Sequence, residues 1–339
     1  MLVTTIASGE VECNLVLPFF SRDSANLMSA RILDGKGLAA TICDELSPRV
    51  DDFLRSSGRP PQLGILLVGD NPASEVYVRN KRRMAEELGL AVDMVHLPAT
   101  ASLNDAKRTI NRFNESESHD GILVQVPVPT AWGSGASRGL FEQIHPAKDV
   151  DSFHSINVGR LMQNRATLMP CTPSGIIELL LRSEIAIEGQ HAVVLGRSEI
   201  VGRPLAMMLL HRHATVTICH SRTPNLASIA ATADLLIVAV GRPVFVTHEF
   251  VKLGATVIDV GINRITDPDL VSTLIAADSV RWKAFERRGS MLVGDVHPHV
   301  QKVAGALTPV PGGVGPLTVA MLMVNTVEAA TARLISKTS

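Results

Sequence analysis

The stretch from residue 191 to residue 223 constrains the fold more than any other part of the chain. It opens with the apolar residues 192–195, a run too short for a helix and bounded by Gly196, as expected of a buried parallel strand. A glycine turn leads to Gly202, after which apolar residues recur at helical spacing before a second strand at residues 215–219. Strand, helix and strand in this order predict a βαβ unit within a parallel sheet.

The turn between Gly196 and Gly202 is a candidate phosphate-binding loop. Glycines between a strand and a helix let backbone N–H groups approach a pyrophosphate, and the helix N-terminus adds partial positive charge. Its sequence, G-R-S-E-I-V-G, departs from the usual G-x-G-x-x-G spacing, so an ordinary strand-to-helix turn remains an alternative. The unit therefore predicts a dinucleotide site without proving one.

The end of the second strand indicates which dinucleotide. NAD-dependent enzymes usually place Asp or Glu there to hold the ribose 2′-hydroxyl, whereas this strand runs into Ser221 and Arg222. Arg197 is available from the preceding turn, and guanidinium groups offer paired donors to phosphate oxygens. Arg222 alone could be a solvated loop residue, but the three together favour NADP over NAD.

Composition limits the remaining possibilities. A chain of 339 residues, 46% apolar and 19% charged, is expected to form two globular domains. The net charge of -1 and the lack of a basic block give no reason to expect nucleic acid or acidic membranes as partners, and no apolar run approaches a membrane span. The four cysteines lack metal-type spacing, so we expect reduced thiols, a cytoplasmic location and no metal site.

The first half of the chain also alternates strands with helices. Apolar residues at every fourth position from Leu38 to Leu54 predict a helix, which Pro48 should kink or split. Ser74 is expected to cap a second helix that ends near Gly89. Further predictions are strands at residues 63–68, 91–97 and 121–126 and a helix at 103–113. Ligands of such parallel sheets gather at the carboxyl ends of the strands.

The second half begins with a helix that we expect Thr172 to cap, with Pro173 at the first helical position. The polar residues 267–289 are interpreted as an insertion into the second domain. The apolar residues 317–327 predict a buried helix that packs back on the first domain. Further strands are predicted at residues 235–240 and 256–260.

Tyr77 and Lys81 lie four residues apart on a predicted helix, so both project from one face. Such a pair is most often a surface packing pair. Short-chain dehydrogenases also use Tyr-x-x-x-Lys, but there the pair follows the nucleotide loop, whereas here it precedes Gly196. That order argues against the short-chain family.

Six separated motifs, taken together, are more specific than any one of them. They are Gly69-Asp-Asn-Pro-Ala-Ser-Glu-Val-Tyr77 with Lys81, Asp120-Gly-Ile-Leu-Val-Gln125-Val-Pro-Val-Pro129, Lys148-Asp-Val-Asp151, Pro170-Cys-Thr-Pro173, Gly196-Arg-Ser-Glu-Ile-Val-Gly202-Arg-Pro204 and Pro309-Val-Pro-Gly-Gly-Val-Gly-Pro316. In content and order the chain closely resembles the bifunctional methylenetetrahydrofolate dehydrogenase/methenyltetrahydrofolate cyclohydrolase (FolD-like) family. The resemblance runs from about residue 30 to the C-terminus.

The resemblance implies an α/β protein with two domains and a cleft between them. Residues 30–169 would form an N-terminal α/β/α folate-binding catalytic domain, onto which a C-terminal helix at 316–337 packs back. Residues 170–315 would form a Rossmann-type NADP-binding domain, and residues 1–29 an N-terminal extension. The family further suggests a cytoplasmic homodimer that serves one-carbon metabolism and purine biosynthesis.

Motif matches also imply roles for individual residues. Lys81 would be the catalytic lysine, supported by Gln125, while Tyr77 would stack near the pterin and aminobenzoyl rings and Asp151 would accept hydrogen bonds from the pterin amino edge. The turn that borders the same pocket contains Pro311, Gly312 and Gly313. The implied cofactor-binding residues are Gly196, Arg197, Ser198, Ile200, Gly202, Ser221, Arg222, Gly241, Ile262 and Thr318.

The implied reaction has two steps. Hydride passes from the methylene carbon of 5,10-methylenetetrahydrofolate to NADP, and water then opens the resulting methenyl cation to 10-formyltetrahydrofolate. The second step needs a base, so we expect Lys81 to be neutral when it meets the cation. Ser152 follows Asp151 where the family usually has glycine, so the local turn, and with it the direction of the Asp151 side chain, could differ from that in the family. Two alternatives share the two-domain plan: a dehydrogenase of the shikimate or amino-acid type, and a non-catalytic NADP- or folate-sensing module.

Overall fold

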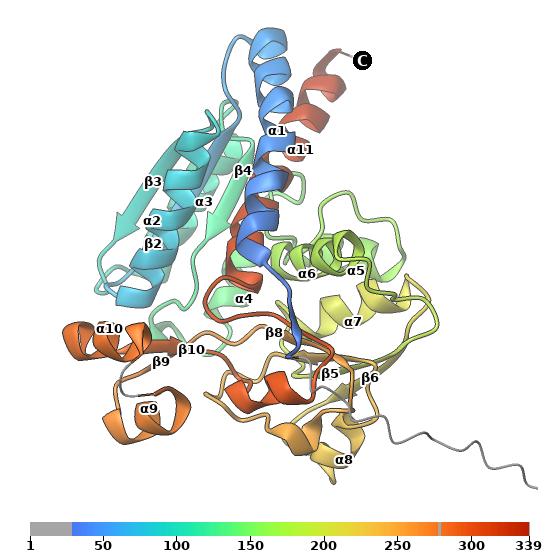
Figure 1. Cartoon of the computed structure of the whole chain (residues 1–339). Coiled ribbons are helices and arrows are strands. Elements are labelled where there is room, and N and C mark those ends of the chain that lie inside the picture. Colours follow the sequence, from blue (N-terminus) through green and yellow to red (C-terminus); the bar gives the residue numbers. More distant parts are fainter. Residues whose placement is uncertain (1–28, 277–278, 339) are drawn as a thin grey trace, which may run out of the picture.

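Two parallel sheets organise the chain, and the computed structural model describes residues 29–276 and 279–338 (Figure 1). The smaller sheet has the strand order β3-β2-β4, with β2 at Gln62–Val68, β3 at Ala91–Leu97 and β4 at Gly121–Val124. All its pairings are parallel, so the carboxyl ends of the three strands meet at one edge. We call this sheet and the helices against it the three-stranded lobe.

Helix α1 (Gly35–Ser57) runs without a break through Pro48, so the predicted split does not occur. Pro48 and Asp44 both lie on the exposed side of the helix, so the carbonyl that loses its N–H partner can be hydrated. The apolar residues at every fourth position were expected to form one buried face, but the last of them, Leu54, is 43% exposed, and Phe53 is buried in its place. A four-residue spacing advances by roughly 40° per repeat around a 3.6-residue helix, so the apolar face shifts by one position along α1.

Helix α2 (Pro72–Glu87) begins three residues earlier than a cap at Ser74 would place it. Asn71 caps it, since its Oδ1 accepts a hydrogen bond from the N–H of Ser74 at 3.2 Å. Ser74 lies inside the first turn and is buried, so the prediction that Ser74 caps the helix is wrong. Proline at the first helical position suits an N-cap one residue before it.

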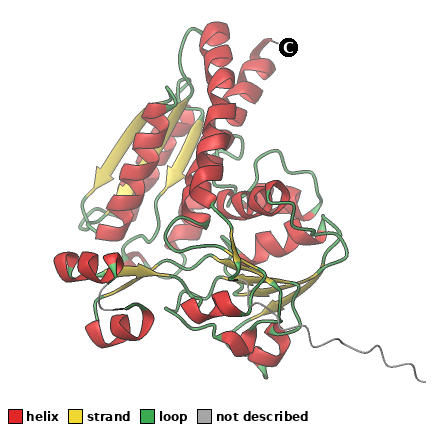
Figure 2. Ribbon diagram, viewed as in Figure 1, coloured by secondary structure: helices red, strands yellow, loops and turns green. Residues whose placement is uncertain are grey.

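The larger sheet has the order β1-β11-β8-β7-β5-β6 and is parallel throughout. The predicted βαβ unit is present as β5 (His191–Leu195), α7 (Gly202–Leu210) and β6 (Thr215–Cys219). The other strands are β1 (Arg31–Ile32), β7 (Leu235–Val238), β8 (Thr256–Asp259) and β11 (Ala306–Leu307). We call this sheet with its helices the six-stranded lobe; the strands of both lobes are drawn in yellow in Figure 2.

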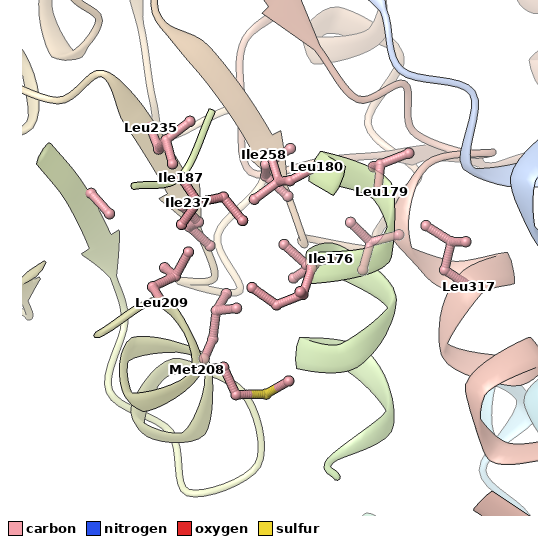
Figure 3. Close-up of a cluster of buried hydrophobic side chains, with 14 of the residues drawn as sticks. Ile176, Leu179, Leu180, Ile187, Met208, Leu209, Leu235, Ile237, Ile258 and Leu317 are labelled. Atoms are coloured by element: carbon pink, nitrogen blue, oxygen red, sulfur yellow. The ribbon is translucent and has the colours of Figure 1, made fainter. Parts of the chain in front are cut away.

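Helix α6 (Cys171–Arg182) covers one face of the larger sheet. Figure 3 shows Ile176 and Leu180 of this helix directed at Ile237 and Ile258 of the sheet, and together they form one buried apolar core. The helix begins after Pro170 without a side-chain cap, so the prediction that Thr172 caps it is wrong. The hydroxyls of Thr172 and Thr318 instead hydrogen-bond each other at 3.0 Å.

The chain crosses between the lobes near both ends of its described part. Strand β1 precedes α1 but pairs with β11 in the larger sheet, although residues 31–32 fall within the range that the sequence assigned to the first domain. Helix α11 (Val314–Thr338) leaves β11 and packs against α1, α6 and α2. Its segment Val314–Ser336 is long and apolar enough to span a membrane by length and composition alone, which the sequence did not lead us to expect, yet 61% of its most apolar stretch is buried in the protein. Packing against the other helices accounts for its apolar composition.

Residues 267–276 and 279–289 contain two helices, which lie in sequence between the strands of a small hairpin. Strands β9 (Asn263–Ile265) and β10 (Met291–Val293) pair antiparallel, and α9 (Pro268–Leu274) and α10 (Val280–Arg288) lie between them in sequence. Val271 and Phe285 join the strands in a separate small core. The remaining helices are α3 (Leu103–Glu115), α4 (Ala136–Phe141), α5 (Ser155–Met162), α8 (Leu226–Ala230) and the 3-10 turns Thr130–Trp132, His248–Phe250 and Pro298–Lys302.

Candidate functional site

A buried lysine lies at the carboxyl edge of the smaller sheet. Lys81 on α2 is 8% exposed, and its Nζ donates a hydrogen bond to Oε1 of Gln125 at 3.0 Å. Gln125 follows β4, and its Nε2 donates to the carbonyl of Val126 at 2.8 Å, which fixes the amide so that its oxygen faces the lysine. Since α2 follows β2 and β4 is the neighbour of β2, the fold brings together two residues that lie 44 positions apart.

Tyr77 lies one turn before Lys81 on the same helix and is half-buried. It is the only tyrosine in the chain. Burial raises the pKa of Tyr77, so its phenol stays protonated and available as a hydrogen-bond donor near neutral pH.

Asp151 shares this region with Lys81. Burial raises the pKa of Asp151, and the positive charge of Lys81 opposes the rise, as does a hydrogen bond from the Cys171 thiol. The same surroundings act on the thiol, because burial raises the pKa of Cys171 well above its usual value. The cysteine is therefore a neutral donor beside a carboxylate.

The turn after Asp151 accommodates Ser152 in a conformation typical of glycine. Ser152 has φ of +61°, in the left-handed region, and is fully buried. Its hydroxyl donates to the carbonyl of Leu168 at 2.8 Å. The backbone thus follows the course that a glycine would take, and the serine adds a hydrogen bond that a glycine lacks.

The two glycines of the nucleotide loop are sterically required. Gly196 has φ of +120°, and a Cβ there would lie 2.2 Å from the carbonyl oxygen of Ala239. A Cβ on Gly202 would lie 2.3 Å from the carbonyl oxygen of Gly196. Ser198 accepts hydrogen bonds from the N–H groups of Val201 and Gly202, so its hydroxyl holds the loop against the start of α7. The close backbone approach that a pyrophosphate needs is built into this turn.

The candidate 2′-phosphate residues lie in the loops that follow two neighbouring strands, β5 and β6. Leu195 and Cys219 pair at the ends of β5 and β6, and Arg197 and Arg222 follow them in exposed loops with Ser221. No carboxylate in the part of the chain that the structure describes forms an ion pair with either guanidinium. Both remain able to bind an anionic ligand.

Gly241 and Ile262 lie in the loops that follow β7 and β8, and Thr318 lies on α11. Gly241 donates its N–H to Oδ2 of Asp295 at 2.8 Å. Ile262 is 42% exposed, and a Cβ on Gly315 would come within 3.3 Å of its side chain, so Ile262 lies against the start of α11, just after the Pro311–Gly312–Gly313 turn. That turn carries the cis peptide Val310–Pro311 and accepts a hydrogen bond from the N–H of Lys36 through Gly312.

A cavity of about 710 Å³ opens between the lobes. It is bordered on one side by the cis peptide Val126–Pro127 next to Gln125, and on the other by Glu199 and Ile200 of the nucleotide loop. Of the predicted site residues only Ile200 lines it. Arg138 of α4 forms an ion pair with Glu199 across this gap, a contact that sequence reasoning missed because the partners are 61 positions apart.

Sequence reasoning also missed two buried carboxylates beneath the nucleotide loops. Asp295 accepts hydrogen bonds from the N–H groups of Val240 and Gly241. Asp259 accepts from three backbone N–H groups, two of them at residues 295 and 296, yet burial raises its pKa to about 7. The available signal was an aspartate at the end of an apolar strand, where a charge requires partners.

Two family models match the chain. Residues 33–151 match the catalytic domain of tetrahydrofolate dehydrogenase/cyclohydrolase, and residues 170–334 match the NAD(P)-binding domain of the same family. Together the matches cover both lobes.

Known proteins resemble the chain over most of its length. It is 50% identical over 306 residues to the bifunctional protein FolD of Koribacter versatilis, covering 90% of this chain and 98% of that protein, and 49% identical over 304 residues to FolD of Solibacter usitatus, covering 89% and 98%. The solved FolD structure from Campylobacter jejuni aligns with a TM-score of 0.78 at 41% identity, over 90% of this chain and 100% of that one. The Trypanosoma brucei enzyme, solved with NADP and an inhibitor, aligns with a TM-score of 0.81 at 37% identity, over 90% and 99%. The chain therefore belongs to the tetrahydrofolate dehydrogenase/cyclohydrolase family.

Proposed function

We propose that the protein oxidises 5,10-methylenetetrahydrofolate with NADP and hydrolyses the methenyl product to 10-formyltetrahydrofolate. One observation carries the proposal: the buried Lys81–Gln125 pair lies directly beside Val126, which lines the cavity between the lobes, and Ile200 of the nucleotide loop lines the same cavity from the other lobe. Full-length similarity to bifunctional FolD proteins supports the same assignment. The shikimate-type and sensing alternatives have no comparable support.

In the first step the protein mainly binds and orients. NADP, when bound, accepts a hydride; Gly196 and Gly202 leave room for its pyrophosphate against backbone N–H groups. The exposed Arg197 and Arg222 suit the 2′-phosphate. Tyr77 offers an aromatic face to the folate rings, and the substrate's own nitrogens stabilise the charge left on its carbon.

The second step needs a base. A water molecule adds to the methenyl carbon, and the Lys81 amine accepts one of its two protons, which leaves a neutral carbinolamine. One carbon–nitrogen bond then breaks as the carbinol oxygen becomes the formyl oxygen, and the remaining water proton passes from that oxygen to the departing nitrogen. Gln125 can assist because its Oε1, held by the bond from Nε2 to Val126, accepts from the lysine and fixes its position.

Asp151 is assigned to substrate recognition. As a carboxylate it accepts N–H hydrogen bonds from the pterin edge. Burial raises its pKa while Lys81 opposes the rise, so the two side chains of the folate site influence each other electrostatically.

The cellular setting belongs to the same proposal. We assign the protein to the cytoplasm as a homodimer, with 10-formyltetrahydrofolate as a formyl donor for purine biosynthesis. Family resemblance supports these points, and the described cysteines, Cys43, Cys171 and Cys219, are free thiols, as expected of a reducing compartment. Light scattering of the purified protein tests the dimer.

One assay tests the activity. Purified protein is mixed with methylenetetrahydrofolate and NADP, and methenyl absorbance is followed as it appears and decays. Appearance followed by enzyme-dependent decay supports both activities, and appearance alone would remove the hydrolase. No methenyl formation with either NADP or NAD would contradict the proposal.

A further inference from the structure

We infer that Asn325 of helix α11 is a positioning residue for Asp151, and that it acts together with Ser152 as a clamp on the turn that carries this carboxylate. The inference rests on the proposed function, since it assigns Asp151 to folate binding. We call Asn325 and Ser152 the Asp151 clamp.

Asn325 ties the Asp151 turn to the start of α6. Its Nδ2 donates to the carbonyl of Val150 at 2.7 Å and to the carbonyl of Met169 at 2.7 Å, and it lies 3.6 Å from Sγ of Cys171. The side chain is 4% exposed. One amide group thus spans the residue before Asp151 and the segment that leads into the six-stranded lobe.

Ser152 holds the other side of the same turn. Its hydroxyl donates to Leu168, so Asp151 lies between two anchored residues, Val150 and Ser152. Sγ of Cys171 also lies 3.3 Å from the Val150 carbonyl oxygen. Anchors at residues 150 and 152, both fastened to residues 168–171, leave the backbone of Asp151 little freedom to rotate.

Both residues of the Asp151 clamp are uncharged, which suits a buried position next to ionisable side chains. Asn325 and Ser152 are neutral donors to backbone carbonyls, so they fix the turn without adding charge beside Asp151 and Lys81. An ionised anchor in this buried position would alter the charge of the folate site. An amide in the middle of an otherwise apolar helix is expected to have such partners.

The position of Asn325 in the chain makes the inference specific. It falls within residues 170–334, which match the NAD(P)-binding domain of the family, yet its hydrogen bonds lead to the folate site. Loss of the amide should therefore weaken folate binding and leave NADP binding intact. A general loss of packing in α11 would not separate the two ligands in this way.

The test compares Asn325→Leu, which keeps the volume but removes the donors, with Thr326→Val as a matched control. Thr326 is fully buried on the same helix, and its hydroxyl bonds only one turn back, to Leu322. We expect Asn325→Leu to raise the KM for methylenetetrahydrofolate about 10- to 100-fold, the equivalent of one charged hydrogen bond, with the calorimetric Kd for NADP unchanged. Thr326→Val should leave both constants unchanged.

Wild-type turnover distinguishes failure of the proposed function from failure of the clamp. A wild type that forms no methenyl product contradicts the proposed function itself. An active wild type whose folate KM is the same in Asn325→Leu contradicts the clamp alone, as does an equal loss of folate and NADP affinity.

Ser152→Ala keeps the inference testable if Asn325→Leu does not fold. It should shift the folate KM in the same direction and spare the NADP Kd, because it releases the other anchor. An unchanged folate KM in Ser152→Ala would refute the two-sided clamp.

Discussion

Replacement of Gly196 by alanine tests the steric requirement of the nucleotide loop. Gly196 has φ of +120°, and an added Cβ would lie 2.2 Å from a backbone oxygen, so the variant combines backbone strain with overlap. Gly189, just before β5, is the matched control: it has φ of +74°, and a Cβ there would meet nothing within 4 Å. Both variants add one methyl group, and only one adds a clash.

The expected magnitudes differ. Gly189→Ala should lower the free energy of unfolding by roughly 1–2 kcal/mol, the cost of the left-handed region for a residue with a Cβ. Gly196→Ala adds an overpacking cost of roughly 1–3 kcal/mol, for a total of about 2–5 kcal/mol. Since Ala239 follows β7, relief of the overlap must move β5 away from β7 and shift the N–H groups that face the pyrophosphate.

Urea unfolding followed by circular dichroism gives the stability change, and calorimetry gives NADP affinity. We expect Gly196→Ala to lose both stability and NADP binding, and Gly189→Ala to lose a little stability and no binding. Equal unfolding free energies for the two variants, with NADP affinity preserved in both, would refute the reasoning.

Three further predictions follow from the described contacts. Lys81→Met should lower methenyl hydrolysis about 10²- to 10⁴-fold, as measured by decay of methenyl absorbance, and unchanged hydrolysis would exclude Lys81 as the base. Arg222→Gln should raise the KM for NADP about tenfold or more and leave that for NAD unchanged; equal effects would place Arg222 outside the 2′-phosphate site. Burial raises the pKa of Asp259 to about 7 from 3.8, so the native state holds the proton more tightly than the unfolded state. Its contribution to stability should be complete below pH 4 and fall by about 4 kcal/mol as pH rises to 7. Urea unfolding of the wild type and of Asp259→Asn across this pH range measures this contribution. Identical pH slopes of the unfolding free energy in the two proteins would contradict the prediction.

Local pattern was enough to predict the regular elements. The βαβ unit at residues 191–219 and the strands of the smaller sheet were recoverable because apolar runs and glycine turns are local signals. Caps were less reliable: Asn71 and Ser74 are both good N-cap residues three positions apart, and the proline at position 72 decides between them. Strand β1 could not be predicted, because two residues carry no period and their partner lies at residue 306.

The candidate site was predictable only in part. The structure brings Lys81 and Gln125 into hydrogen-bond contact, as the motifs suggested, whereas their roles stay predictions. Asn325 was missed although a polar residue in an apolar helix signals a buried partner, because the sequence does not say which carbonyls it meets. Long-range pairings of this kind depend on the tertiary fold.

Strands β1 and β11 are neighbours in the larger sheet, and each of them leads into a helix that packs on the three-stranded lobe. One connection runs from β1 to α1 and the other from β11 to α11. Two backbone hydrogen bonds join the connections, from the N–H of Leu33 to the carbonyl of Leu307 and from the N–H of Lys36 to the carbonyl of Gly312. These hydrogen bonds couple the two connections, so that a displacement of one would carry the other with it. Any change in the width of the cavity between the lobes would therefore have to be accommodated by both connections at once.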